Sequence, residues 1–156
     1  MSWRWAVIAT TALLTSVVLA QGQEVQLLDN AGFEDGLEGW SLWPTETGAT
    51  LNIDTQIKAE GNASLRIDAT SPSDRAFALR STTDFEPGVI YRVSVAIRKG
   101  PTVPDSAVGF LINFRAENGL ILRRADPLAL QKTPEDGWTR WSGLFYDDAE
   151  GVATWQ

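Results

Sequence analysis

The chain has 156 residues, 13 Lys plus Arg against 20 Asp plus Glu, and neither cysteine nor histidine. This length suits one domain with one hydrophobic core. Without cysteine there are no disulfides, thiolate metal ligands or cysteine nucleophiles, and without histidine there is no Ser-His catalysis or histidine-ligated metal. The net charge of −7 argues against nucleic-acid binding, because phosphate contacts need clustered Lys and Arg.

The first twenty residues have the features of a signal peptide. Arg4 supplies a positive start, Ala6 to Ala20 is an uncharged and mostly apolar run, and Val18-Leu19-Ala20 offers small residues to a signal peptidase. The run is short for a membrane span. We expect cleavage before Gln21, a secreted, extracellular or cell-surface location, and no membrane contact after cleavage. An uncleaved N-terminal anchor is the alternative.

From Val25 onward, short runs of alternating polarity are separated by turn signals, and no amphipathic helical stripe stands out. The expected strands lie at residues 25–28, 50–54, 64–69, 91–98, 108–115, 120–123 and 139–146. Pro87-Gly88, Asn118-Gly119 and Asp136-Gly137 supply turns before three of them. The sequence therefore predicts an all-β fold, a two-sheet antiparallel jelly-roll sandwich formed by residues 21–156.

The alternation also predicts which side chains face the core and which face outward. In the strand at 91–98, the residues at odd positions are apolar and should face the core. The outward residues of the long strands are then Arg92, Ser94, Ala96, Arg98, Leu111, Asn113, Arg115, Arg140, Ser142, Leu144 and Tyr146. We expect Trp40, Trp138 and Trp141 to be core residues, and Trp43, just before Pro44, to be exposed.

Two carboxylates are enough for glycoside hydrolysis, so pairs of acids need a test. Glu34-Asp35, Glu135-Asp136 and Asp147-Asp148 are adjacent in sequence, at turns or strand ends. Adjacent strand residues point to opposite faces, so none of these pairs is set to flank one bond. We interpret them as solvated turn acids and expect no enzyme in this domain; a small glycosidase or lyase is disfavoured.

Residues 30–40, Asn-Ala-Gly-Phe-Glu-Asp-Gly-Leu-Glu-Gly-Trp, combine large apolar anchors with glycines and carboxylates. Such a segment can be an ordinary loop whose aromatic side chains plug the end of a sandwich. It can also pin the chain against the core and hold a hard cation through oxygen ligands at the same point. Both interpretations remain open on the residues alone.

The spacing of this segment resembles the opening motif of the sandwich-type carbohydrate-binding modules of families four, nine and twenty-two. Residues 60–65, 86–95 and 137–143 are also similar to that group in order and separation, so the resemblance covers nearly all of the chain from Val25. It implies a secreted, non-catalytic module that holds an attached polysaccharide-active enzyme on a polysaccharide or oligosaccharide, with the catalytic domain downstream in the same chain. The alternative is a structural or adhesive β-sandwich of a cell-surface protein without sugar specificity.

The resemblance further implies a ligand cleft on the outward face of one sheet. The residues expected to bind substrate there are Arg98, Asn113, Arg115, Arg140 and Tyr146, together with Trp43. Ala96 stands where a central aromatic side chain is often found, and the face is rich in arginine. We therefore expect an acidic, uronate-bearing polymer to bind better than a flat neutral glucan. Solvated strand residues on an unused face are the alternative.

The resemblance also implies a structural Ca²⁺ site near the opening motif. The Gly32 carbonyl and the Glu34 carboxylate would contribute, with a carbonyl near Glu60-Gly61 completing one side. A further aspartate that the family takes from its last strand is not found. Because the family continues for two more strands after its Trp-Thr strand, we expect this chain to be a fragment that lacks its last strand or strands and ends inside one beginning near Val152.

Overall fold

The computed structural model describes residues 5–16, 25–44, 48–71, 75–86, 88–109, 111–125, 131–146 and 152–156. These ranges contain strands β1 (Trp5–Ser16), β2 (Val25–Gln26), β3 (Ser41–Trp43), β4 (Thr50–Asp54), β5 (Ser64–Ala69), β6 (Phe77–Leu79), β7 (Ile90–Lys99), β8 (Ile112–Arg115), β9 (Ile121–Ala125), β10 (Gln131–Glu135), β11 (Trp138–Tyr146) and β12 (Thr154–Trp155), and one short 3₁₀ helix, η1 (Asp105–Ala107). Within them, no helix has the length and apolar character needed to cross a bilayer.

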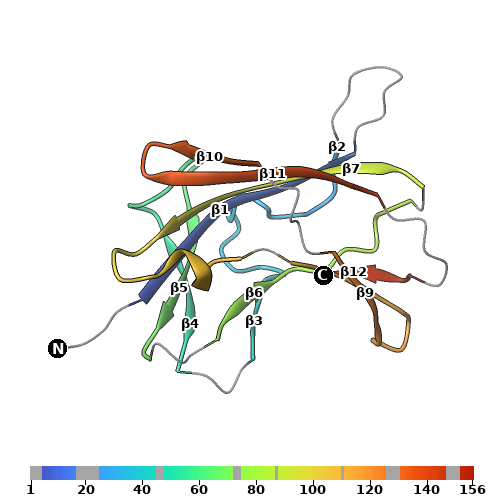
Figure 1. Ribbon diagram of the computed structural model, residues 1–156, viewed down its shortest axis with the longest axis horizontal. Coiled ribbons are helices and arrows are strands. Elements are labelled where there is room, and N and C mark those ends of the chain that lie inside the picture. Colours follow the sequence, from blue (N-terminus) through green and yellow to red (C-terminus); the bar gives the residue numbers. More distant parts are fainter. Residues whose placement is uncertain are drawn as a thin grey trace.

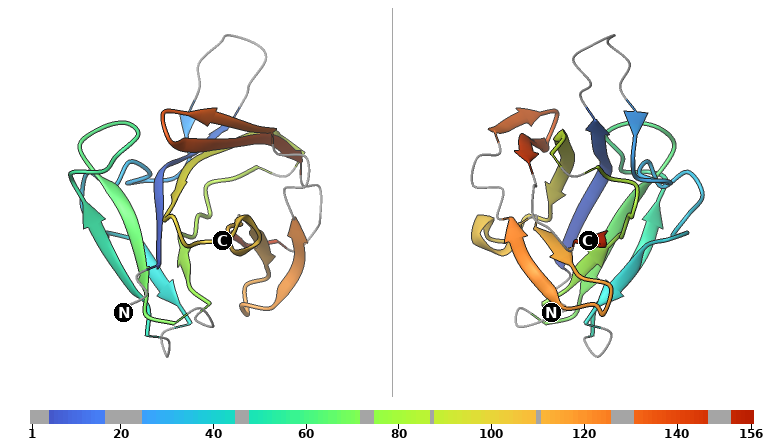
Figure 2. Two further views of the ribbon diagram at one scale, coloured as in Figure 1. Left: turned by 60° about the vertical axis from the view of Figure 1, so that its left-hand side comes forward. Right: turned by 90° about the vertical axis from the view of Figure 1, so that its right-hand side faces the viewer.

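The strands form one large sheet and two small ones. The large, seven-stranded sheet has the order β10-β11-β7-β1-β5-β4, with β2 paired to β1. A three-stranded sheet, β12-β8-β9, and a two-stranded sheet, β3-β6, lie apart from it (Figures 1 and 2). Every pairing between these strands is antiparallel. The prediction of an all-β antiparallel sandwich is confirmed.

Apolar clusters join the large sheet to each small one. Val93 of β7 belongs to one cluster with Phe114 of β8, and Leu65 of β5 belongs to another with Phe33 and the partly buried Ala78 of β6. The core face predicted for β7 from alternation is confirmed, because its apolar residues at odd positions from Tyr91 to Ile97 are all buried. The opposing faces of the sheets therefore bury the apolar half of each alternating strand.

The strands at 50–54 and 64–69 have the predicted bounds, and the hairpins after Asn118-Gly119 and Asp136-Gly137 form as predicted. Asp136 and Gly137 both have positive φ, 48° and 82°, which a type I′ hairpin requires. Sequence reasoning missed β3, β6 and β10. The first two are only three residues long, too short for alternation to be informative, and β10 contains Pro134 at the edge of its sheet.

The strand predicted over 108–115 begins only at Ile112, so its first part is wrong. The helix η1 ends just before Val108, whose N–H donates to the Asp105 carbonyl at 3.3 Å. Val108 therefore completes a turn instead of pairing with a neighbouring strand. Phe110, expected on the apolar face, lies outside the described residues.

Residues 5–16, expected to belong to a leader, form β1 in the middle of the large sheet. The strand runs antiparallel to β5 on one side and to β7 on the other, with a register shift between Thr10 and Leu13 along β7. In Figure 1 it is the blue strand next to β7. The cleavage of residues 1–20 stays a prediction.

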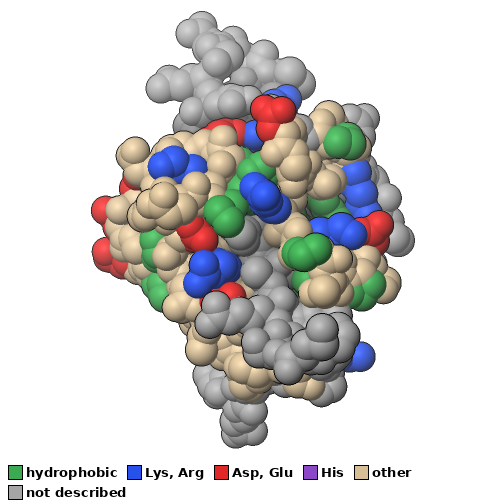
Figure 3. Space-filling model, turned by 90° about the vertical axis from the view of Figure 1, so that its left-hand side faces the viewer, with side chains coloured by type: hydrophobic (Ala, Val, Ile, Leu, Met, Phe, Trp, Pro, Cys, Tyr) green, Lys and Arg blue, Asp and Glu red, His purple; other side chains and the backbone are tan. Residues whose placement is uncertain are grey.

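Basic and acidic side chains are intermixed on the side of the molecule drawn in Figure 3. Lys and Arg side chains lie among Asp and Glu side chains and apolar ones there. This arrangement suggests that several arginines are neutralised by neighbouring carboxylates, which the individual contacts below bear out.

Candidate binding surfaces and the opening motif

Asn30 organises the opening motif. Its side-chain amide donates to the carbonyls of Gly36 at 3.1 Å and Glu38 at 3.0 Å, while its Oδ1 accepts from the Asp35 N–H at 3.0 Å. The Trp40 indole N–H donates to the Asn30 carbonyl at 3.0 Å. One asparagine thus satisfies polar groups along the whole loop, because its amide can donate twice and accept at the same time.

The same loop inserts Phe33 into the core. Phe33 has a φ of 61° and is only 1% exposed, and its ring centroid lies 5.0 Å from that of Trp40 at an interplanar angle of 48°. It belongs to the buried cluster with Ala63 and Leu65. A bulky residue in the left-handed region is strained, so burial of its ring must outweigh that strain.

Glu34 links the opening motif to the turn before β5. Its two carboxylate oxygens accept hydrogen bonds from the Asn62 backbone N–H at 2.8 Å and the Asn62 side-chain amide at 3.0 Å. These bonds, the backbone one foremost, lower the pKa of Glu34 below its ordinary value. A Cβ built on Gly61 would lie 2.3 Å from Glu34 Oε1, and one built on Gly32 would lie 4.0 Å from it. The carboxylate therefore sits close to both glycines.

The residues expected to hold calcium are thus brought together only in part. Glu34 lies close to Gly32 and Gly61, and hydrogen bonds from Asn62 lower the pKa of its carboxyl group. The Glu60 side chain, in contrast, forms an ion pair with Arg140 of β11. Among the described residues no group of three or more acidic side chains is gathered in a way that suits a metal ion. The cation site stays a prediction.

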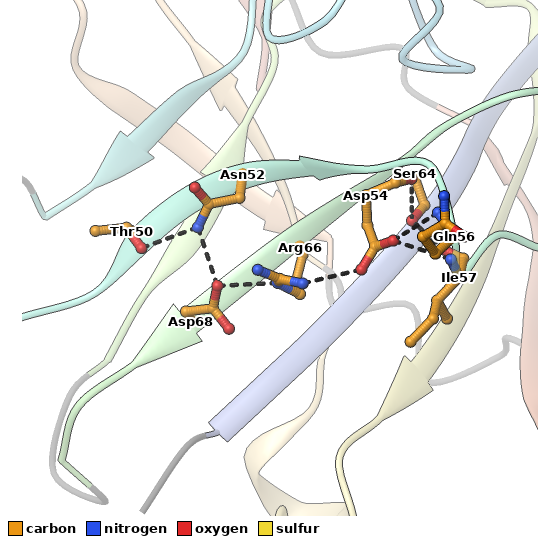
Figure 4. Close-up of polar contacts among 8 residues, drawn as sticks. All are labelled: Thr50, Asn52, Asp54, Gln56, Ile57, Ser64, Arg66 and Asp68. Atoms are coloured by element: carbon orange, nitrogen blue, oxygen red, sulfur yellow. Dashed lines mark hydrogen bonds and ion pairs between the residues drawn. The ribbon is translucent and has the colours of Figure 1, made fainter. Parts of the chain in front are cut away.

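A ladder of polar side chains crosses the outward face of β4 and β5 (Figure 4). Arg66 bridges two carboxylates: Nη1 lies 2.9 Å from Asp54 Oδ2, and Nε lies 2.9 Å from Asp68 Oδ2. The Asn52 amide donates to Asp68 at 3.0 Å and to the Thr50 hydroxyl at 3.0 Å. Sequence analysis missed this ladder, although the polar half of the alternation in both strands was a signal for it.

Asp54 anchors the loop that follows β4. Its Oδ1 accepts from the N–H groups of Ile57 at 2.9 Å and Gln56 at 2.8 Å. The Ile57 bond is the main reason that the pKa of Asp54 is lowered, and the Gln56 bond and Arg66 add to the effect against the opposing influence of burial. The Ser64 hydroxyl donates to the Ile57 carbonyl at 2.5 Å. The loop is therefore held from both strands of the hairpin.

This loop covers part of the face that was expected to be an open cleft. Ile57 packs on the cluster formed by Ala96 of β7 and Trp138 of β11, which are 2% and 6% exposed. Ser94, the neighbouring outward position, is 7% exposed. The expectation of an open surface at Ser94 and Ala96 is wrong, because both are buried, and at Ala96 the loop after β4 contributes Ile57 to the cover. The burial predicted for Trp138 is confirmed.

The predicted binding residues do not share one sheet surface, and that expectation is wrong. Arg98 and Arg140 belong to β7 and β11 of the large sheet, whereas Asn113 and Arg115 belong to β8 of the three-stranded sheet. Alternation gives the face of each residue within its strand but not the sheet that the strand joins. The Tyr146 side chain lies outside the described part, although its backbone pairs with Ile90.

Most of these side chains already have partners within the chain. Arg115 donates through Nε to Gln156 Oε1 at 2.9 Å and through Nη1 to the Gly119 carbonyl at 2.7 Å. Asn113 is 9% exposed and accepts from Arg124 at 3.2 Å. Arg98, in contrast, is exposed, and within the described ranges no ion pair to it is found. Of the predicted arginines, Arg98 is the one best placed to meet a ligand.

Trp43 is exposed, as predicted, and has an aromatic neighbour that sequence analysis missed. Trp43 of β3 is paired in register with Phe77 of β6, and the two are 56% and 41% exposed. Their ring centroids lie 5.9 Å apart at an interplanar angle of 42°. Exposed large aromatic side chains next to each other form an apolar surface that a soluble protein usually keeps for a ligand or partner.

A family profile described as a carbohydrate binding domain matches residues 25–151, most of the chain. The chain belongs to this family of carbohydrate-binding domains. No protein of curated function and no solved structure gave a significant match. The resemblance inferred from the opening motif and the three later stretches is therefore confirmed. Such domains bind sugars and are not themselves catalytic.

In this carbohydrate-binding domain, sequence analysis missed two features around the candidate surfaces. Phe77 sits in a three-residue strand with no recognisable pattern, so only its pairing to Trp43 reveals it. The partner of Arg140, Glu60, is 80 residues away in sequence, and only the closure of the loop after β4 brings the two side chains together.

Proposed function

We propose that this protein is a secreted, non-catalytic carbohydrate-binding module that keeps an attached polysaccharide-active enzyme on its glycan. Membership of the carbohydrate-binding domain family is the observation that carries the proposal. Adsorption of the module turns the encounter between enzyme and polymer into an intramolecular event and raises the effective concentration of substrate. No chemistry by the module itself is needed for this role.

The Trp43–Phe77 pair is the proposed stacking surface. Tryptophan offers a large apolar ring face and an indole N–H, which suits the apolar face and the hydroxyls of a pyranose ring. The two rings are tilted by 42°, so they cannot lie flat under one planar sugar chain together. A twisted or branched chain that presents two sugar faces at an angle fits this pair better than a flat ribbon.

Arg98 is the proposed polar contact on the large sheet. A guanidinium group can hold a carboxylate through two parallel hydrogen bonds and can also donate to neutral hydroxyls. The pairing of Arg66 and Arg140 with internal acids reduces the number of arginines available to a uronate. The preference for an acidic glycan therefore rests on Arg98, and it should weaken as salt screens the charge.

Affinity electrophoresis against a panel of neutral and uronate-bearing polysaccharides tests the proposal. We expect at least one polymer to retard the protein. Trp43→Ala or Phe77→Ala should reduce retardation by any such polymer, and Arg98→Ala should reduce it chiefly for uronates at low salt. Arg75→Ala, a change at an exposed arginine outside the strands, is the matched control and should leave retardation unchanged.

Three outcomes would contradict the proposal. Retardation by no polymer in the panel favours the structural or adhesive sandwich of a cell-surface protein. Loss of binding on Arg115→Ala but not on Arg98→Ala would move the polar contact to the three-stranded sheet. Release of reducing sugar by the purified chain would make the domain a glycosidase.

We also propose that Glu34, with backbone oxygens near Gly32 and Gly61, holds a structural calcium ion. The observation in support is that the Glu34 carboxylate lies close to both glycines. Hydrogen bonds from Asn62, and the charge of Lys58 to a smaller extent, lower the pKa of this carboxyl group. Calcium accepts mixed sets of carboxylate and carbonyl oxygens. With Glu60 paired to Arg140, its side chain is not part of the proposed ligand set.

A further inference from the structure

A small polar pocket lies where the segment after β6 meets the chain between β2 and the opening motif. Its polar lining comes from Asp29 and from residues 80–84, and Leu27 gives it one apolar side. Its volume is about 190 Å³, below the roughly 300–1,000 Å³ of sites for drug-sized ligands. The pocket therefore suits a single small unit, and its lining includes none of the residues proposed above for stacking, for the polar contact or for calcium.

Arg80 is the basic residue of this pocket, and its guanidinium group has no close partner. Its Nε is buried and, among the residues that the structure describes, donates to no acceptor. Nη1 lies 3.5 Å from the Glu38 carbonyl oxygen and Nη2 lies 3.6 Å from Asp29 Oδ2. Both distances exceed the roughly 2.7–3.2 Å of a good N–H···O hydrogen bond. The group therefore keeps the capacity to donate to a ligand.

The backbone of the opening motif makes room for this guanidinium group. A Cβ at Gly39 would overlap Arg80 Nη1, and the φ of Gly39 is 74°, in the left-handed region that favours glycine. Arg80 thus occupies a cradle that a side chain at position 39 would fill. Because the cradle restricts the arginine before any ligand binds, less side-chain entropy is lost on binding.

The segment that follows Arg80 adds hydroxyl groups and a carboxylate. Thr82 Oγ1 accepts from the Asp84 N–H at 3.1 Å and lies 3.4 Å from the Leu27 carbonyl oxygen. Thr82 therefore positions this turn next to the chain after β2. Ser81, Thr83 and Asp84 are exposed, so their polar groups are accessible to a ligand.

The charges of the lining determine which sugar the pocket suits. Arg80 supplies one positive charge, whereas Asp29 and Asp84 supply two negative charges, so the formal charge of the lining is negative. A uronate carboxylate would meet this excess of negative charge. A neutral sugar hydroxyl can instead accept from a guanidinium N–H and donate to a carboxylate at the same time.

We propose that this pocket binds one neutral sugar unit through two neighbouring hydroxyls. Arg80 donates to the hydroxyl oxygens, and the carboxylates of Asp29 and Asp84 accept the hydroxyl protons. The inference rests on the proposed function and deepens it, because it assigns a subsite for a neutral sugar unit. Its residues differ from the Trp43–Phe77 pair and from Arg98, which was proposed to meet a uronate.

Titration of the isotope-labelled full-length protein, followed by NMR, tests the subsite. The probes are the methyl glycosides of glucose, galactose, mannose and xylose, with galacturonate as the acidic comparison. We expect at least one neutral glycoside to cause a saturable shift of the Arg80 Nε–H signal and of the amide signals of residues 81–84. Galacturonate should bind more weakly than that glycoside, because the lining is negatively charged.

Three variants separate binding from folding. Asp29→Asn should weaken binding of the neutral glycoside by about tenfold, because it replaces a charged acceptor by a neutral one. The Asp29 side chain is 89% exposed, so this change should leave the melting temperature unchanged. Asp35→Asn, at an exposed acid of the opening motif outside the pocket, is the matched control and should not affect binding. Arg80→Lys keeps the charge but loses the planar set of donors and should also weaken binding.

Each contrary result overturns the subsite. These results are the absence of a saturable shift with every neutral glycoside, equal binding by the parent protein and Asp29→Asn, and tighter binding of galacturonate than of the neutral glycosides. Trp43→Ala should leave the glycoside titration unchanged while it reduces retardation by polysaccharides. If polymers retard the protein but no glycoside shifts these signals, the subsite alone is wrong. If a glycoside binds but no polymer retards the protein, the Trp43–Phe77 and Arg98 surfaces are wrong and the subsite stands.

Discussion

Phe33 tests how the opening motif is stabilised. Burial of its ring should favour the motif, whereas its left-handed backbone conformation should oppose it. Its φ is 61°, its side chain is 1% exposed, and it packs with Trp40 and Leu65. Phe33→Ala should destabilise the domain by about 3–5 kcal/mol, because a buried aromatic ring is lost and a cavity remains. The alanine keeps its Cβ, and so it keeps the left-handed strain of about 1–2 kcal/mol.

Phe33→Gly creates the same cavity but removes the strain. In ordinary strand or helix positions glycine is worse than alanine by about 0.5–1 kcal/mol, because the unfolded chain gains freedom. At position 33 the relief of strain exceeds this cost. We therefore expect Phe33→Gly to be more stable than Phe33→Ala by about 0.5–1 kcal/mol, the reverse of the usual order.

Leu65 is the matched control, since it is fully buried in the same cluster but lies in the regular strand β5. There Leu65→Ala should be more stable than Leu65→Gly by about 0.5–1 kcal/mol. Urea unfolding followed by tryptophan fluorescence gives the four free energies, and unchanged m-values would show that the compactness of the states is comparable. If glycine is worse than alanine at both positions, the strain assigned to Phe33 is not present.

Gly39→Ala should lower the free energy of unfolding, measured in urea, more than Gly36→Ala does. Both positions have positive φ, but only at Gly39 would the new Cβ meet another atom, Arg80 Nη1, at 1.0 Å. Equal losses of stability would contradict the packing of Arg80 against the motif. Because the pKa of Asp54 is lowered in the folded protein, its carboxylate stabilises the fold at pH values above the ordinary pKa of 3.8. This stabilisation is lost as the pH falls through the lowered pKa of the folded state. Asp54→Asn should therefore reduce the melting temperature at pH 7 and make the melting temperature fall less steeply below a pH of about 4. If the melting temperature of the variant depends on acid pH as that of the parent protein does, Asp54 is not the group responsible. Calcium chloride should raise the melting temperature and EDTA should reverse the rise, whereas no response to either would exclude the proposed cation site at Glu34.

The sequence by itself determined the local structure wherever the residues of one short segment are enough to specify a strand or a turn. Period-two alternation gave β4, β5 and β7, because side chains of a strand must point alternately to core and solvent. Asp136-Gly137 gave a hairpin, because two successive positive φ values favour these residue types. The absence of cysteine and histidine excluded whole classes of chemistry, and the spacing of the opening motif and later stretches gave the carbohydrate-binding family.

Only the tertiary structure decided how these elements are combined. Alternation places Asn113 and Arg115 on the outward side of their strand, but β8 joins the three-stranded sheet, away from Arg98. The pairing of Glu60 with Arg140 depends on how the loop after β4 folds back towards β11. The pairing of Trp43 with Phe77 depends on β6, a strand too short to recognise from the sequence. The place of residues 5–16 between β5 and β7 depends on which edges are free when the sheet assembles. Such long-range pairings are set by the competition of many surfaces for burial, and no local pattern encodes them.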